Sequence, residues 1–202
     1  MKRLFYIAVA TFAGLLYTSC NEDTDVFATQ NDSLVKYLTS NRHLIAEEEI
    51  GSVIEDNPLF YSTFGRYTYR YIPNYYSEER NEWSTVEAGD RVEIEFDAYI
   101  FNGSEPSIND LYWSNIPATI SKVESSKTNP YVDLNWAETP LSFVVGAGEV
   151  IQGLDEAMVG CHDQDSVQVY MTYTMAYGKH LIGTVPKQSS VAWYMKIVNV
   201  IK

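Results

Sequence analysis

The sequence predicts an α+β fold in which an antiparallel β-sheet packs around one short α-helix, with a helical extension at the N-terminus. Apolar side chains alternate strictly with Arg, Glu and Asp over residues 91–98, which is typical of a half-buried strand. Looser alternation predicts strands at 141–145, 167–171 and 191–197, whereas residues 149–159 carry apolar side chains at helical spacing. Strands outnumber helices, and neither an internal repeat nor a strand-helix-strand rhythm is present, so the strands are expected to pair antiparallel.

The N-terminal half is less regular. Asn31 or Asp32 is placed to cap a short helix. One side of that helix would carry Leu34, Val35, Tyr37 and Leu38. Residues 41–58 are polar and acidic, so we expect a solvated connector there. From Leu59 to Tyr71, aromatic and polar residues alternate loosely, which predicts strand structure.

Two further segments are polar. Residues 77–84 predict a loop, and residues 104–139 form a long stretch rich in Ser, Asn and Pro that also carries Trp113, Tyr131 and Trp136. A stretch of that length inside a domain is usually a functional insertion or a lid. We therefore expect residues 104–139 to be an insertion in the sheet-rich body.

Composition excludes several classes of protein. The 202 residues contain 46% hydrophobic residues, enough for one sizeable core with a short appendage. Lys and Arg number 14 against 27 Asp and Glu, giving a net charge of −13, and such a field repels a phosphate backbone, so nucleic acid is not an expected partner. Two cysteines are too few for a disulfide framework or a cysteine metal site.

The first residues predict export. Lys2 and Arg3 precede an apolar run over 4–16 that is too short to span a bilayer, so residues 1–19 are expected to be a signal peptide. Thr18-Ser19 before Cys20 resembles a lipobox, with Tyr17 where an aliphatic residue is usual. We expect lipid on Cys20, an acidic tether and short helix over 20–58, and a place in the envelope of a Gram-negative bacterium, either periplasmic or on the outer-membrane surface. The alternative is an ordinary signal peptide with a chance cysteine.

The C-terminal half carries two linked motifs. The first runs from Pro140 to Asp155 and contains Gly-x-x-Glu-Val-Ile-x-Gly; the second is Ala-Tyr-Gly at 176–178, followed by Val185-Pro186 and a terminal strand with Trp193. Together they resemble the FKBP-type peptidyl-prolyl isomerases. The resemblance covers residues 89–202, interrupted by the insertion, within an expected domain over 59–202.

That resemblance implies a five- or six-stranded antiparallel sheet wrapped around one helix, with a shallow aromatic pocket that receives proline. Tyr177 would bind the substrate backbone through its hydroxyl, and the Ile151 N–H would hold a substrate carbonyl. Trp193, as an aromatic wall residue, and Phe96, at a position where the family commonly has Tyr, would complete the catalytic group. The implied substrate-binding positions are Val150, Leu154, Leu141, Tyr112, Thr184 and Val185.

The resemblance implies an isomerase that assists folding of exported proteins at X–Pro bonds and needs neither cofactor nor metal. Its partners would be proline-containing segments of those proteins, and the membrane through Cys20. Leu154 stands where the family usually has Trp, and no aspartate accompanies Tyr112. A non-catalytic peptide-binding module of an envelope lipoprotein therefore remains an alternative, as does a surface lipoprotein that contacts carbohydrate through its Tyr and Trp clusters.

Other groups favour a structural interpretation. Cys161-His162-Asp163 contains the residue types of a catalytic triad, but consecutive residues seldom converge on one substrate, so we expect a buried cysteine beside a solvated turn. His180 is expected at the surface. The aromatic run over 60–76 suits sheet packing better than sugar stacking. Taken alone, Val150, Ile151 and Leu154 would be ordinary core residues, and only the joint motif makes them pocket residues.

Overall fold

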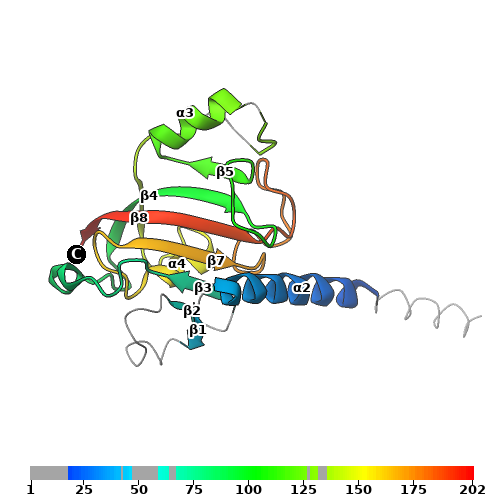
Figure 1. Ribbon diagram of the computed structural model, residues 1–202, viewed down its shortest axis with the longest axis horizontal. Helices are drawn as coiled ribbons and strands as arrows, with labels where there is room; N and C mark the ends of the chain where they lie inside the picture. Colours follow the sequence, from blue (N-terminus) through cyan, green and yellow to red (C-terminus); the bar gives the residue numbers. More distant parts are fainter. Residues whose placement is uncertain (1–17, 42, 47–58, 64–66, 127, 132–135) are drawn as a thin grey trace, which may run out of the picture.

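The computed structural model describes residues 18–41, 43–46, 59–63, 67–126, 128–131 and 136–202 (Figure 1). The strands are β1 (His43–Ala46), β2 (Leu59–Thr63), β3 (Thr68–Tyr71), β4 (Arg91–Ile100), β5 (Leu111–Ser114), β6 (Leu141–Val144), β7 (Ser166–Met171) and β8 (Val191–Ile201). The helices are α2 (Thr18–Asn41), α3 (Pro117–Ser126), α4 (Gln152–Met158) and the 3₁₀ helix η3 (Glu78–Glu82). Most of the predicted signal peptide, and residues 47–58, lie outside the described residues.

One eight-stranded sheet organises the molecule, with the order β1-β2-β3-β7-β8-β4-β5 and with β6 also paired to β4. All pairs are antiparallel except β1 with β2. The long central pair, β4 with β8, runs from Arg91 opposite Ile201 to Ile100 opposite Val191, with a register shift between Glu93 and Ile94. The predicted α+β class with an antiparallel sheet is confirmed, although the sheet has more strands than the five or six implied.

The main core lies between the sheet and α4. The alternation predicted for β4 is present, since Val92, Ile94, Phe96 and Ala98 are each 0% exposed. From α4, the side chains of Leu154, Ala157 and Met158 complete this core. A short helix is marginal on its own, so burial of this apolar face against the sheet is what stabilises α4.

Two buried charged side chains hold α4 in place. At its C-terminal end, Arg70 of β3 donates hydrogen bonds from Nη1 to the carbonyl oxygens of Ala157 (2.5 Å) and Val159 (2.6 Å). Near its start, the Asp155 carboxylate accepts from the backbone N–H groups of Gly146 (2.7 Å) and Gly148 (3.1 Å). The turn between β6 and α4 is thereby fixed, which places residues 149–151 at the start of the helix.

Helix α2 covers the opposite face of the sheet. Leu34 and Leu38 are buried there against residues of β3, β7 and β8. The sheet side of this second core consists of Tyr69, Tyr71, Phe101, Tyr170 and Ala192. Sheet packing of Tyr69 and Tyr71 is therefore confirmed, whereas the side chains of residues 59–63 lie outside the description.

The predicted short helix is longer than expected and begins earlier. Asn31 and Asp32 lie inside α2 instead of capping it, and the acidic stretch 21–25 is helical. The sequence from 18 to 41 contains neither Gly nor Pro, and its C-terminal half is anchored on the sheet, so the helix extends toward the N-terminus without a break. Among the residues described, no helix is both long enough and apolar enough to cross a membrane.

Three segments that were expected to be irregular because of their polar composition contain secondary structure. The expected connector 41–58 includes β1, which pairs with β2. The expected loop 77–84 includes η3, whose Arg80 is buried because it pairs with Asp165. The insertion 104–139 includes α3 and also β5, which adds an edge strand to β4 and places Tyr112 beside the core.

Candidate functional site

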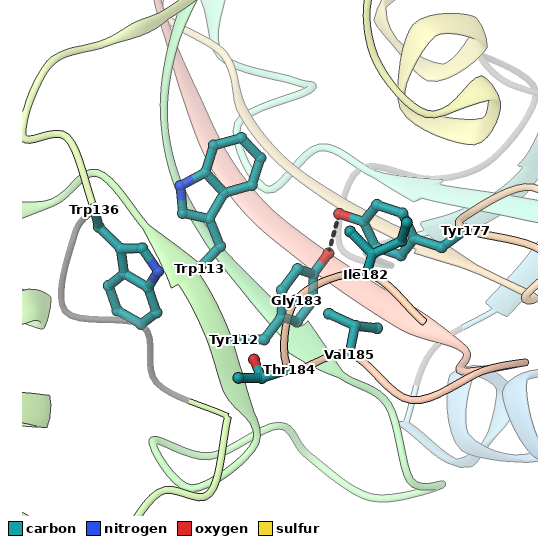
Figure 2. A pocket seen from close by; sticks show the side chains of 8 residues that line it. All are labelled: Tyr112, Trp113, Trp136, Tyr177, Ile182, Gly183, Thr184 and Val185. Atoms are coloured by element: carbon teal, nitrogen blue, oxygen red, sulfur yellow. Dashed lines mark hydrogen bonds between the residues drawn. The ribbon is translucent and has the colours of Figure 1, made fainter. Parts of the chain in front are cut away.

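A pocket of about 260 Å³ opens where the insertion meets two loops from the C-terminal half (Figure 2). It is lined by Tyr112, Trp113, Trp136, Tyr177, Ile182, Gly183, Thr184 and Val185. The first three come from the insertion, Tyr177 from the loop after β7, and the rest from residues 179–190, here called the flap. Its walls are mostly aromatic and aliphatic, and its volume suits a small apolar group with few polar contacts.

A hydrogen-bonded chain of three aromatic side chains connects the inner wall of the pocket to the core behind it. The Trp193 indole N–H donates to the Tyr112 hydroxyl at 2.9 Å. The hydroxyls of Tyr112 and Tyr177 lie 3.1 Å apart, and a dashed line in Figure 2 marks their hydrogen bond. Since the Tyr112 oxygen already accepts from Trp193, Tyr112 has its own proton to donate to Tyr177. In that arrangement the Tyr177 proton is available to a carbonyl oxygen of a ligand.

Burial keeps both tyrosines protonated. Desolvation raises the pKa of Tyr112 well above its ordinary value, and it also raises the pKa of Tyr177, against a smaller opposing effect of the hydrogen bond from Tyr112. The ordinary pKa of a tyrosine is about 10. Both hydroxyls are therefore neutral donors at physiological pH, and the site presents no charge to a ligand through them.

Phe96 and Trp193 lie behind the pocket and do not line it. Their rings stack with centroids 4.5 Å apart, and Trp113 meets the two rings edge-on at 4.8 and 5.7 Å. Phe96 is 0% and Trp193 is 2% exposed, so neither can touch a ligand without rearrangement. They support Tyr112 and Trp113, which do line the pocket.

The residues at the start of α4 also stay outside the lining. Val150 and Ile151 are half-buried at the edge of the core, Leu154 is fully buried, and Leu141 is half-buried on β6. Within the described part of the chain, the Ile151 N–H has no hydrogen-bond acceptor. Two residues on, the Gly153 N–H donates to the Met175 carbonyl at 2.8 Å, which ties this end of α4 to the loop that carries Tyr177.

The structure thus brings together four of the predicted site residues as pocket lining: Tyr112, Tyr177, Thr184 and Val185. Sequence reasoning missed Trp113, Trp136, Ile182 and Gly183 as lining residues. Tryptophans in an otherwise polar insertion were the available signal for the first two. Ile182 and Gly183 directly precede Thr184 in the flap, where their neighbours were already expected to contact a ligand.

The structure gives Cys161 and His162, which are residue types of a catalytic triad, a structural role. Cys161 is 0% exposed, and burial raises the pKa of its thiol, so it is neutral and shielded from solvent. The His162 ring is held by the Arg80 carbonyl at 2.8 Å and by the Thr85 hydroxyl at 3.2 Å. His180 is exposed on the flap, as expected.

One short helix packed into an antiparallel sheet, with an aromatic pocket closed by the loop after β7 and by the flap, defines an FKBP-like fold. A crystal structure of the three FKBP domains of wheat FKBP73 has this fold, with a TM-score of 0.50 and 15% identity over 71% of this chain and 51% of that one. At this level of identity the likeness concerns the fold alone.

Sequence comparison points to the same family. Residues 119–198 match the family model of the FKBP-type peptidyl-prolyl cis-trans isomerases. A stretch of 68 residues, 34% of this chain, is 34% identical to FK506-binding protein 3 of Yarrowia lipolytica. A stretch of 62 residues, 31% of this chain, is 34% identical to FK506-binding protein 2 of Gibberella zeae. These matches cover only 17% and 32% of the two relatives. Phe96 and Tyr112 precede the part matched by the family model.

Proposed function

We propose that this protein is a peptidyl-prolyl cis-trans isomerase that acts on X–Pro bonds of exported polypeptides. The observation that carries the proposal is the small aromatic pocket with the neutral Tyr177 hydroxyl in its wall, in a domain of the FKBP type. Such a pocket accommodates a proline ring among apolar side chains while a hydrogen bond holds the neighbouring peptide group.

The chemistry requires neither a nucleophile nor a metal. Rotation about the amide bond has a barrier of about 18–20 kcal/mol because resonance must be broken. The twisted amide has less charge separation than the planar form, so a water-poor apolar pocket favours it. Binding the twisted state more tightly than the planar states is sufficient for catalysis, and each tenfold acceleration requires about 1.4 kcal/mol of that preference.

The proposal predicts that the protein accelerates a refolding reaction limited by proline isomerisation, and that Tyr177→Phe lowers kcat/KM by about threefold to tenfold, as expected for one neutral hydrogen bond. Tyr67→Phe is the matched control, because Tyr67 is 40% exposed and lies away from the pocket lining. Its kcat/KM should equal that of the wild type. Refolding that is no faster with the wild-type protein than in buffer would eliminate the enzymatic proposal.

A non-catalytic peptide-binding module is the second candidate, and one observation favours it. Leu154, at the position where the family usually has the floor Trp, is fully buried and does not line the pocket, so the pocket lacks an aromatic floor at that position. Titration of a fluorescent proline-containing peptide separates the two candidates. Saturable binding that Tyr177→Phe weakens, without any acceleration of refolding, would establish the module instead of the enzyme.

We further propose that the mature protein is attached to the cell envelope through lipid on Cys20, which the lipobox-like sequence before it supports. Wild-type protein expressed in a Gram-negative host should partition into the detergent phase, whereas Cys20→Ser should remain in the aqueous phase. Cys161→Ala is the control, since Cys161 is buried and should not affect partitioning. Equal partitioning of wild type and Cys20→Ser would contradict the anchor.

A further inference from the structure

We infer that Gln30 of α2 is a positioning residue for the pocket, because it joins the loop of Tyr177 to the base of the flap. The inference rests on the proposed function, in which these two segments hold the proline-containing peptide. It makes α2, which precedes the domain expected over 59–202, part of the machinery that shapes the site.

The Gln30 carboxamide makes one hydrogen bond to each segment. Its Oε1 accepts from the backbone N–H of Tyr173 at 3.1 Å, and its Nε2 donates to the carbonyl of Gln188 at 2.5 Å. Tyr173 begins the turn that carries Tyr177, and this turn is closed by the hydrogen bond from the Gly178 N–H to the Tyr173 carbonyl at 2.8 Å. A carboxamide is suited to this position because it offers an acceptor and a donor on one planar group.

Gln188 has an unfavourable backbone conformation that these contacts hold in place. Its φ of +56° lies in the left-handed region, which costs free energy for a residue with a side chain. Its N–H donates to the Gly178 carbonyl at 3.0 Å, and its carbonyl accepts from Gln30. The flap is thereby fastened at its base to the residue that follows Tyr177.

Helix α2 does not depend on Gln30 for its own docking. Leu34 and Leu38 are 0% and 1% exposed, and Tyr69 donates from its hydroxyl to Asn31 Oδ1 at 2.7 Å. Substitution of Gln30 should therefore leave the helix on the sheet and release only the two loops. The effect should appear in the affinity of the pocket, through Thr184 and Val185 of the flap, more than in the stability of the fold.

The test compares Gln30→Ala with wild type in the full chain. We expect kcat/KM for a proline-containing peptide to fall about tenfold, mainly through a higher KM, as two hydrogen bonds are lost. Amide hydrogen exchange should become faster over residues 179–190, with the thermal transition nearly unchanged. Thr29→Ala is the matched control, since Thr29 is the adjacent, exposed residue of the same helix. It should behave as wild type in all three measurements.

A second pair of variants separates positioning from a general structural role. Gln30→Glu keeps the acceptor for Tyr173 but loses the donor to Gln188, so we expect a flap as labile as in Gln30→Ala. Adding Gln188→Gly to Gln30→Ala should restore most of kcat/KM, because glycine adopts a positive φ without strain and no longer needs the Gln30 contact to stay there.

The outcomes keep the inference and the proposed function apart. If wild type catalyses isomerisation while Gln30→Ala retains its KM and its flap exchange, the inference is wrong and the function stands. If wild type does not catalyse, the enzymatic proposal fails. Flap exchange and the Kd of a proline-containing peptide then decide the inference by the same comparison.

Discussion

Replacing Asp165 with alanine should lower the free energy of unfolding by about 3–5 kcal/mol, because it leaves the Arg80 guanidinium buried without its partner. Arg80 donates from Nε to Asp165 Oδ1 at 2.8 Å and from Nη2 to Oδ2 at 3.0 Å, and the two side chains are 8% and 0% exposed. Asp165 also accepts from the His162 N–H at 2.7 Å. Urea denaturation of the variant and the wild type measures the difference.

Two further variants test that explanation. Asp163→Ala removes a nearby carboxylate that is only half-buried and accepts hydrogen bonds from its neighbour Gln164, so its loss should cost less than about 1 kcal/mol. The double variant Arg80→Met with Asp165→Leu removes both charges and should recover much of the stability, as apolar replacements of buried pairs often do. If Asp165→Ala is no less stable than Asp163→Ala, the buried pair is not the anchor of η3.

Much of the sheet could be predicted because several of its strands show an alternation of apolar and polar residues in their own sequence. Where one face of a strand is buried, apolar residues must alternate with polar ones, and β4 shows this from Arg91 to Ala98. β6, β7 and β8 carry the same signal more loosely, and α4 has the helical period. Each of these elements was predicted close to its observed bounds.

The remaining elements depend on partners distant in the chain. β1 has four residues and exists through its pairing with β2, and β5 is a strand because β4 offers it an edge. Arg80 and Asp165 lie 85 residues apart, so nothing near either one signals that η3 is anchored. A polar segment that obtains its structure from long-range contacts has the composition of a loop.

The candidate site likewise contains residues that the sequence could place and residues that depend on the three-dimensional fold. The family resemblance placed Tyr177, Thr184 and Val185 near one another, and the structure has them in one pocket. It could not place Trp136, whose position depends on how the insertion folds back. Nor could it show that Trp193 is buried behind Tyr112, since a motif assigns residue types to positions without stating how deeply each is covered.

That burial makes Trp193 a strong test of how the pocket is built. Trp193→Ala should lower the free energy of unfolding by about 3–5 kcal/mol, as expected for removing a fully buried aromatic side chain. It would also abolish peptide binding, since Phe96 loses the ring stacked on it at 4.5 Å and Tyr112 loses its hydrogen-bond donor. Chemical denaturation and peptide titration measure the two effects.

Trp193→Phe separates the support of the wall from the orientation of its hydroxyls. The stacked ring is largely kept, so the stability should fall by only about 1–2 kcal/mol, the cost of the lost N–H donor and some volume. Without that donor, the Tyr112 oxygen is free to accept the Tyr177 proton, which then competes with a ligand carbonyl for it. Trp193→Phe should therefore bind a proline-containing peptide more weakly at a temperature where it is fully folded. Unchanged affinity in that variant would show that the Trp193–Tyr112–Tyr177 chain does not direct the Tyr177 proton.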